Sequence, residues 1–410
     1  MKIIFLLGFV TAACFTHAGE NWPQFRGPTG DGQSDATGLP LRWSESENVK
    51  WKTAIPGEGW SSPVVFGEQI WMTTALDGGK SLRAIGVDRN TGKLLRDVEI
   101  FPVEAPQFKH ALNSYASPTP ALETGRVYVH FGTYGTACLN TDTGKILWQN
   151  RDLKLQHENG PGSTPILWHD KLIFHCDGMD VRFIVALDKA TGKIAWKTER
   201  SGEINRPPSR KKAYGTPLLA TIHGSDQLIS VAADYFYGYE PEGGKELWRL
   251  HYDGYSNVAM PVIGDGLIFF STGFDKAQFW AIHDDAKGEI KSGEVVWKYL
   301  KQVPQKPSPI FFDGRIYLVS DNGIATCLDA KTGKELWQER LGGEYSASPV
   351  CAEKKIYFFS QEGTSIVLEP GETFKPLATN QLGNGFMASA AIARKAFYLR
   401  SKTDLYRVEK

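Results

Sequence analysis

Apolar and polar residues alternate in short runs along most of the chain, and similar runs recur from one end to the other. Examples are "QIWMTT", "RVYVHFG", "GLIFFSTG" and "KIYFFSQEG", which are rich in Ile, Val, Tyr and Phe. Short alternating runs of this composition, bounded by Gly, Asp or Asn, are typical of β-strands. The pattern therefore predicts an all-β protein.

A recurring turn follows many of these runs. It reads "LNTDTGKILW" from Leu139, "LDKATGKIAW" from Leu187, "YEPEGGKELW" from Tyr239 and "LDAKTGKELW" from Leu328. Glycine accepts the positive φ of a tight turn, and an Asp or Asn side chain bonds the turn's own backbone. Each copy therefore predicts a hairpin whose second strand carries a Trp.

A second recurring word opens each unit and contains a small residue and a Pro. It reads "SSPVV" at Ser61, "STPIL" at Ser163, "GTPLL" at Gly215 and "ASPVC" at Ala347. Together with the runs between the two words, each unit contains four short strands. A period of roughly 40–50 residues with four strands per unit is typical of a β-propeller.

The opening word occurs eight times, but the last unit, from Ala388, ends before its Trp-bearing strand. Residues 48–57, "NVKWKTAIPG", supply such a strand with Trp51 in place. We therefore predict an eight-bladed β-propeller of four-stranded antiparallel blades, closed by pairing of an N-terminal strand with C-terminal strands, because closure removes exposed sheet edges. Seven blades is the alternative if one of the last two units is not a blade.

The N-terminal residues predict that the protein is exported. Residues 1–18 combine Lys2, a short apolar run and a small-residue cleavage site before Gly19, as a signal peptide does. We expect residues 19–47 to form an N-terminal arm and residues 48–410 the propeller. The mature protein is then periplasmic or extracellular and has no integral membrane segment, with lipoprotein anchoring at Cys14 as an alternative.

The charge balance narrows the class of partner. The chain has 46 Lys and Arg residues and 46 Asp and Glu residues. A neutral chain without a long basic run argues against nucleic acid as a partner. The one locally basic stretch, residues 201–213, is expected to be a solvated loop, with a docking site as the alternative.

Cysteine and histidine are expected to give no catalytic or metal site. Cys138, Cys176, Cys327 and Cys351 each lie in a β-rich run and are expected to be buried free thiols, although a Cys138–Cys176 bridge stays open. His130 and His175 are expected to be hydrogen-bonded core residues, with a metal site as the alternative. The sequence contains no nucleophile elbow, zinc-protease motif or P-loop.

The pattern Leu-Asp-x-x-Thr-Gly-Lys-x-x-Trp at Asp188–Trp196 and Asp329–Trp337 resembles the repeat of the pyrroloquinoline-quinone (PQQ) type propellers, over essentially the whole mature chain. The resemblance implies that a Trp of one blade packs against the Thr-Gly turn of its neighbour. It assigns this structural girdle to Trp51, Trp148, Trp196, Trp248, Trp297 and Trp337.

The same family contains quinoprotein dehydrogenases, which hold PQQ and Ca²⁺, and non-catalytic scaffolds of the BamB type. This chain lacks an adjacent Cys pair, and its carboxylates are scattered along the sequence. We therefore expect no cofactor and a monomeric, non-catalytic module that binds a protein or carbohydrate partner. The alternative is a PQQ- and Ca-dependent quinoprotein dehydrogenase that oxidises an alcohol or sugar.

The segments just before each opening word are expected to line one mouth of the axial channel as a funnel. Aromatic, amide and cationic side chains recur there and suit a planar or sugar-like ligand or a peptide strand. The other interpretation is that they only pack and cap the mouth. The candidate ligand-binding residues are Arg26, Trp60, Asn113, Tyr115, Asn159, Tyr214, Asn257, Lys306, Tyr345, Asn384 and Phe386.

Overall fold

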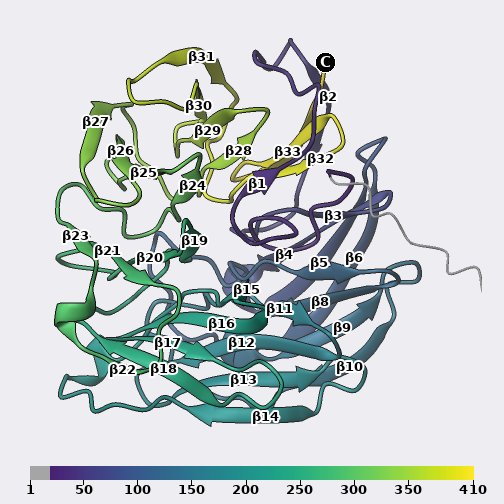
Figure 1. The fold of residues 1–410 in the computed structure, drawn as a ribbon. Helices are drawn as coiled ribbons and strands as arrows, with labels where there is room; N and C mark the ends of the chain where they lie inside the picture. Colours follow the sequence, from purple (N-terminus) through teal and green to yellow (C-terminus); the bar gives the residue numbers. More distant parts are fainter. Residues whose placement is uncertain (1–18) are drawn as a thin grey trace, which may run out of the picture.

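The computed structural model describes residues 19–410, which form eight four-stranded blades around one axis (Figure 1). The predicted eight-bladed, all-β architecture is confirmed. Figure 1 looks roughly along the axis, so that the first strand of each blade lies near the centre and the last lies at the periphery. The predicted signal peptide and Cys14 lie outside the described residues.

Blades 1 to 4 follow the chain in order, each as an antiparallel meander. Their strands are, for blade 1, β3 (Val64–Phe66), β4 (Gln69–Leu76), β5 (Ser81–Asp88) and β6 (Leu94–Pro102); for blade 2, β7 (Ala121–Glu123), β8 (Arg126–His130), β9 (Thr136–Asn140) and β10 (Ile146–Asn150); for blade 3, β11 (Ile166–Trp168), β12 (Lys171–Asp177), β13 (Arg182–Asp188) and β14 (Ile194–Glu199); and for blade 4, β15 (Leu218–Ile222), β16 (Ser225–Ala232), β17 (Tyr235–Tyr239) and β18 (Glu246–His251).

Blades 5 to 8 repeat this arrangement. Their strands are, for blade 5, β19 (Val262–Gly264), β20 (Leu267–Ser271), β21 (Phe279–His283) and β23 (Trp297–Tyr299); for blade 6, β24 (Ile310–Phe312), β25 (Arg315–Val319), β26 (Ile324–Asp329) and β27 (Glu335–Arg340); for blade 7, β28 (Val350–Ala352), β29 (Lys355–Phe359), β30 (Thr364–Leu368) and β31 (Pro376–Gln381); and for blade 8, β32 (Ala391–Ala393), β33 (Ala396–Arg400), β34 (Asp404–Val408) and β2 (Val49–Ala54). Four single-turn 3₁₀ helices lie in the connections: η1 (Asp77–Gly79), η2 (Gly132–Tyr134), η3 (Pro208–Arg210) and η4 (Ser292–Glu294).

Blade 8 contains both ends of the propeller. Strand β2 pairs antiparallel with β34, with Val49 opposite Val408 and Ala54 opposite Asp404. The pairing continues beyond the strands, because the Ile55 amide donates to the Thr403 carbonyl at 2.8 Å and the Glu409 amide donates to the Asn48 carbonyl at 2.8 Å. The predicted closure is therefore confirmed, and no blade is left with its last strand missing.

Tryptophans fasten neighbouring blades together at the outer strands. The indole Nε1 of Trp148 donates to the Lys189 carbonyl in the turn of blade 3, at 3.0 Å. A Cβ on the turn's Gly192, whose φ is +73°, would lie 2.4 Å from that indole, so glycine is needed there both for φ and for space. The indoles of Trp51, Trp196, Trp297 and Trp337 make the equivalent bond at 2.9–3.1 Å.

Trp248 departs from the predicted girdle. Its indole lies over Gly238 of its own blade and donates to the Gln227 side chain at 3.1 Å. The reason is an added strand, β22 (Gly288–Ile290), which pairs parallel with β18 and lies beside Trp248. In blade 1, where Arg96 replaces the Trp, the guanidinium instead donates to the Asp142 carbonyl of blade 2.

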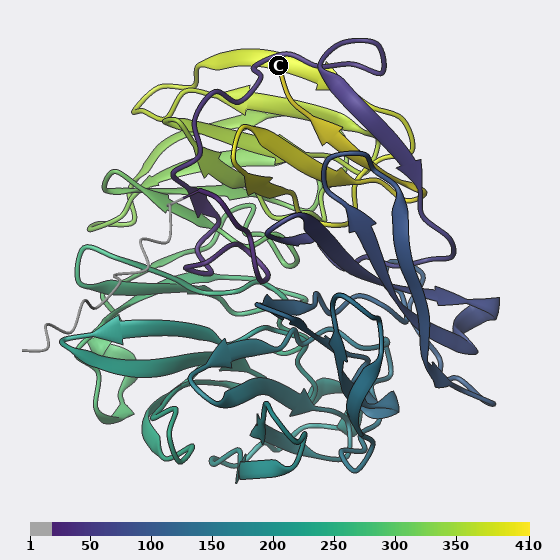
Figure 2. The ribbon, with the colours of Figure 1, turned by 90° about the vertical axis from the view of Figure 1, so that its right-hand side faces the viewer.

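Residues 19–47 lie across one end of the axis (Figures 1 and 2). Trp22 exchanges two 2.8 Å backbone bonds with Val65, and the Leu122 amide donates to the Pro23 carbonyl at 2.8 Å. Further along the arm, β1 (Gln33–Ser34) pairs parallel with β28. The arm thus contacts the innermost strands of blades 1, 2 and 7.

The remaining expectations concern single side chains. All four described cysteines are free and buried, so the Cys138–Cys176 bridge does not form. His130 Nδ1 lies 2.8 Å from the Thr136 hydroxyl, and His175 Nε2 lies 2.9 Å from the Ser230 hydroxyl. Within residues 19–410, the longest helices are far shorter and less apolar than a membrane span requires.

Candidate functional site: the axial funnel

A cavity of about 570 Å³ opens on the axis at the end where the innermost strands begin. Phe25 of the arm also lines it. The arm therefore provides part of its floor, and the segments that lead into the innermost strands provide its walls. This is the funnel that the repeat pattern predicts.

The neck of the funnel is a ring of hydroxyl groups. In each blade the ring residue stands directly before the Pro of the opening word, or before Ala390 in blade 8. It is Ser or Thr in seven blades and Met260 in blade 5. In each linked pair, the backbone amide of one ring residue donates to the hydroxyl of the ring residue in the next blade, at 2.9–3.2 Å. The donors are Ser62, Thr119, Thr164, Met260, Ser308, Ser348 and Ser389.

Each of these hydroxyl groups has an O–H donor that makes no hydrogen bond within residues 19–410. A Ser or Thr hydroxyl offers one O–H donor and two lone pairs. Each ring hydroxyl accepts one amide, and among residues 19–410 none of the seven O–H groups has an acceptor. All seven border the cavity, so they can donate to water or to oxygen atoms of a ligand.

The position two residues before each ring residue lines the wider part of the funnel. It carries a different side chain in almost every blade: Trp60, Ser117, Gly162, Tyr214, Val258, Lys306, Ser346 and Met387. The ring residues vary little, whereas these positions vary in size and charge. The shape and charge of the wider part of the funnel therefore depend on these eight positions.

Charged groups at the funnel are largely paired. Lys306 Nζ lies 3.1 Å from Asp321 Oδ1, and Lys212 forms an ion pair with Glu158. Arg210 has no carboxylate within ion-pair distance among residues 19–410, and its guanidinium lies 5.4 Å from the centre of the Tyr255 ring. The basic stretch 201–213 thus contributes to the funnel rim and is not only a solvated loop.

Five of the predicted residues line the funnel: Trp60, Asn113, Asn159, Tyr214 and Lys306. The Asn113 Nδ2 group donates to the Asn159 and Pro161 carbonyls at 2.8 and 3.1 Å, so this amide holds two loops together. The Tyr214 hydroxyl donates to the His157 carbonyl at 2.7 Å, and burial raises the pKa of Tyr214. Burial lowers the pKa of His157 to about 4, and its Nε2 accepts the Thr133 amide at 3.1 Å. His157 is thus a neutral structural acceptor.

Five other predicted residues do not line the funnel. Tyr345 and Phe386 are buried, Tyr345 among core residues of blades 6 and 7 and Phe386 against Phe359 of blade 7. Asn257 donates to the Tyr252 hydroxyl at 2.8 Å. Tyr115 donates to the Gln107 carbonyl at 2.7 Å, and Asn384 lies on the surface bonded to Thr403. Consecutive side chains of an extended segment point to opposite sides. A shift of one residue from the lining positions therefore turns Asn257, Tyr345 and Phe386 into the blades.

Arg26 also lies away from the funnel lining. It is 1% exposed, and its guanidinium donates to the Gly30 carbonyl at 3.2 Å and to the Asp31 and Pro309 carbonyls at 2.6 Å. Burial lowers its pKa to about 10, which the nearby Asp31 partly opposes. In this structure Arg26 fastens the arm to blade 6.

The sequence interpretation missed two groups of lining residues. The hydroxyl ring had a signal, because Ser or Thr precedes Pro in six opening words, but that position was interpreted only as the start of a strand. Tyr255 lies in the segment just before the opening word of blade 5, but only the amide of Asn257 was selected from that segment. Phe274 lies in the connection between β20 and β21, and Asp321 lies in the short turn between β25 and β26, neither of which was considered as funnel lining.

The metal that the resemblance implies can be tested against these residues. A Ca²⁺ ion takes six to eight oxygen ligands. The two acids that line the funnel, Glu158 and Asp321, are each paired with a lysine, and no group of three His, Cys, Asp or Glu side chains within residues 19–410 is placed to hold a metal ion. The funnel residues therefore do not fit a Ca²⁺ site.

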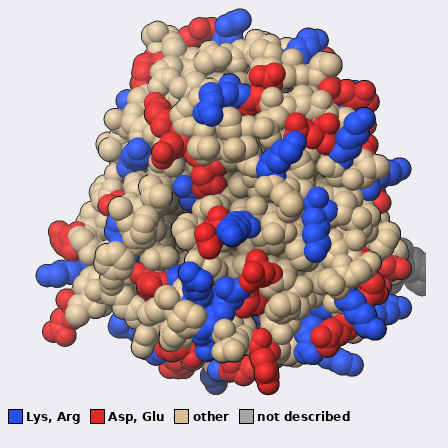
Figure 3. All heavy atoms as spheres, turned by 90° about the vertical axis from the view of Figure 1, so that its left-hand side faces the viewer, with Lys and Arg blue, Asp and Glu red and all other residues tan. Residues whose placement is uncertain are grey.

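Charged side chains of both signs lie on the face of the molecule shown in Figure 3. Figure 3 shows acidic and basic side chains intermingled over one side of the molecule. This distribution agrees with the formal net charge of zero.

The sequence matches one protein-family model and is similar to several known proteins. The model of a family described as outer membrane protein assembly factor BamB matches residues 104–203 and 182–409. The chain is 23% identical over 259 residues to tetrathionate hydrolase of Acidithiobacillus ferrooxidans, covering 58% of this chain and 48% of that protein. It is 22% identical over 250 residues to BamB of Yersinia pestis, covering 49% of this chain and 62% of that protein. The chain thus spans less than two thirds of either relative.

Solved structures share the fold. A europium-containing methanol dehydrogenase superposes with a TM-score of 0.67 at 12% identity, covering 93% of this chain and 89% of that chain. At this identity, the likeness shows the fold alone.

Proposed function

The chain belongs to the PQQ-like β-propeller family described as outer membrane protein assembly factor BamB, and from this premise we propose that it is an exported, non-catalytic module whose axial funnel binds a protein partner. The observation that carries the proposal is the funnel itself. Its cavity of about 570 Å³ ends on seven hydroxyl groups whose O–H donors have no acceptor within residues 19–410.

The mouth of the funnel favours a protein as the partner. Three of its lining residues are large apolar side chains that remain exposed: Leu112 at 43%, Val258 at 38% and Phe274 at 50%. Exposed apolar side chains gathered at the edge of a cavity are typical of protein-interaction surfaces. A carbohydrate would use the hydroxyl ring and Trp60 but would leave this apolar rim in water.

The chemistry of the lining supports binding rather than catalysis. General acid–base catalysis needs a titratable group free to exchange a proton with substrate. The funnel acids Glu158 and Asp321 are each paired with a lysine, and the nearby His157 is buried and neutral. His110 also lines the funnel, and its Nδ1 atom accepts the Leu112 amide at 3.2 Å. The relatives described as assembly factors favour a periplasmic location, and we propose that the chain is exported to that compartment or beyond the cell.

Site-specific photocrosslinking tests the proposal. A benzophenone amino acid replaces Val258 or Phe274 at the mouth, or Leu147 on the outer strand β10 as a control, in the full chain made in its own cells. We expect a protein adduct of defined mass at the two mouth positions and none at Leu147. A glycan array probed with the purified chain distinguishes a carbohydrate ligand. Glycan binding that Trp60→Ala abolishes, with no protein adduct at the mouth, would reject a protein partner.

The alternative function is a PQQ- and Ca-dependent dehydrogenase. The purified chain is incubated with PQQ and calcium chloride, and reduction of a dye is followed with an alcohol or a sugar. We expect the rate to equal that of a protein-free control. Oxidation above this control would overturn the non-catalytic proposal.

A further inference from the structure

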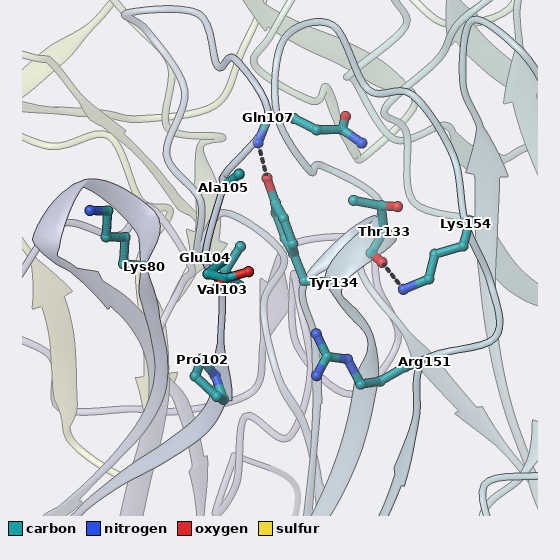
Figure 4. A pocket seen from close by; sticks show the side chains of 10 residues that line it. All are labelled: Lys80, Pro102, Val103, Glu104, Ala105, Gln107, Thr133, Tyr134, Arg151 and Lys154. Atoms are coloured by element: carbon teal, nitrogen blue, oxygen red, sulfur yellow. Dashed lines mark hydrogen bonds between the residues drawn. The ribbon is translucent and has the colours of Figure 1, made fainter.

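A second hollow, of about 670 Å³, lies between blades 1 and 2 (Figure 4). Its floor is the segment 102–107, which leaves β6 and bends at Glu104 and Ala105. Lys80 after η1 lies on one side, and Tyr134 of η2 with the segment that follows β10 lies on the other. We call this hollow the blade 1–2 groove.

The groove is lined by cations that lack acidic partners. Lys80, Arg151 and Lys154 are all exposed, and within residues 19–410 none of them lies within 4.0 Å of a carboxylate oxygen. Lys154 Nζ donates to the Thr133 carbonyl at 3.1 Å, and the Arg151 guanidinium lies 5.2 Å from the centre of the Phe101 ring. Glu104 is the one acid that lines the groove. The groove therefore carries a net positive charge in a chain whose total charge is zero.

The floor of the groove has unpaired backbone groups. The Val103 amide donates to the Lys80 carbonyl and the Gln107 amide donates to the Tyr134 hydroxyl, both at 2.8 Å, so the segment is fixed at both ends. Between these anchors, the amides of Glu104 and Ala105 have no acceptor among residues 19–410. Both residues are exposed, so these amides can donate to oxygen atoms of a bound segment.

The groove and the funnel are joined by one loop. The segment that forms the groove floor continues through Phe108, which is 70% exposed, to Leu112 and Asn113 in the funnel lining. A partner seated on the mouth can therefore reach the groove across an exposed aromatic side chain.

We propose that the blade 1–2 groove binds an acidic segment of the protein partner that the funnel engages. The proposal rests on the proposed function for the source of the segment. Charge complementarity selects the acidic chemistry, and the free amides of Glu104 and Ala105 add donors for its oxygen atoms. Exposed ion pairs are individually weak, so three cations together are expected to favour an acidic segment over a neutral one by roughly tenfold.

Fluorescence anisotropy of the full chain tests this inference. The probes are a labelled peptide rich in Asp and Glu and a matched peptide with Asn and Gln in their place. We expect the acidic peptide to bind at least about tenfold more tightly, and added salt to reduce this difference. The triple variant Lys80→Gln, Arg151→Gln, Lys154→Gln should lose most of the preference.

The matched control removes the same number of charges elsewhere. Lys93, Lys145 and Lys193 are exposed on the Thr-Gly-Lys turns and lie outside both hollows. Their triple substitution by Gln should leave the affinity within about twofold of wild type. Equal binding of the two peptides, or equal loss in both triple variants, would overturn the inference.

Two further measurements separate the possible failures. Vesicles containing anionic lipid are tested with the same variants, and binding to vesicles without binding to the acidic peptide would also overturn the inference. Crosslinking at Val258 and Phe274 reports on the funnel independently. If the adducts at Val258 and Phe274 persist but the chain shows no preference for the acidic peptide, the groove inference is wrong and the proposed function is unaffected.

Discussion

The hydroxyl ring predicts a measurable cost for removing a single oxygen atom. In the Thr164→Val variant the side chain keeps its shape but loses the hydroxyl that accepts the Thr119 amide at 3.0 Å. Both residues are buried, at 2% and 3% exposure. An unpaired buried donor costs about 1–3 kcal/mol. Because the ring borders a cavity that water can enter, we expect the lower half of this range, about 1–2 kcal/mol.

Urea unfolding followed by tryptophan fluorescence measures the change in the free energy of unfolding. The control is Thr379→Val on β31, where the threonine is exposed and its side chain makes no hydrogen bond within residues 19–410. An exposed substitution of this kind changes stability by less than about 0.5 kcal/mol. If Thr164→Val and Thr379→Val shift the free energy equally, the ring does not fasten the blades and the reasoning is wrong.

Blade 5 provides a natural comparison within the ring. Met260 has no hydroxyl, so the Thr216 amide has no acceptor among residues 19–410. We expect this amide to exchange with deuterium faster than those of Thr119 and Thr164. Equal protection at the three amides would contradict the hydrogen-bond assignment.

Three further predictions concern the outer strands and the core. Trp148→Ala should lower the free energy of unfolding by about 3–5 kcal/mol, because it removes a large packed side chain and its bond to the Lys189 carbonyl; thermal unfolding of the variant measures this, and a loss under 1 kcal/mol would contradict it. Gly192→Ala should destabilise more than Gly224→Ala, since both have positive φ (+73° and +79°) but only Gly192 faces an indole; equal losses in urea unfolding would mean that the indole contact is unimportant. Stability should fall on acidification from pH 6.5 towards pH 4, because burial lowers the pKa of His130 to about 3 and of His157 to about 4, so that the unfolded chain binds protons in this range and the folded chain does not. His130→Gln should make the pH dependence of unfolding shallower, and an unchanged slope would show that His130 is protonated in the folded state.

The repeat made the fold predictable because it encodes each contact locally. The Thr-Gly turn and the Trp that follows appear in one hairpin, and five of the six predicted indoles bond the next blade's turn. The closing strand was predictable because Trp51 marks it as the missing member of the last unit. Trp248 was not, because the added strand β22 comes from a stretched connection that the repeat does not describe.

The funnel lining was harder to predict because side-chain direction depends on register. Tyr345 precedes the lining residue Ser346, and Phe386 precedes the lining residue Met387. The aromatic residues were selected because of their size, and each prediction was therefore one position too early. Asn257 differs from Val258 in the same way. A register taken from the Ser or Thr before each Pro would have selected the lining side chains directly.

The joint between β2 and β34 has a mechanical consequence. Val49 pairs with Val408 at one end of this joint and Ala54 pairs with Asp404 at the other, so residues 48 and 409 emerge at the same end. A force that pulls these two residues apart loads the hydrogen bonds one after another, as a zipper opens, rather than all at once. Under such tension the ring yields at blade 8 first, while the seven blades made from continuous chain are still intact.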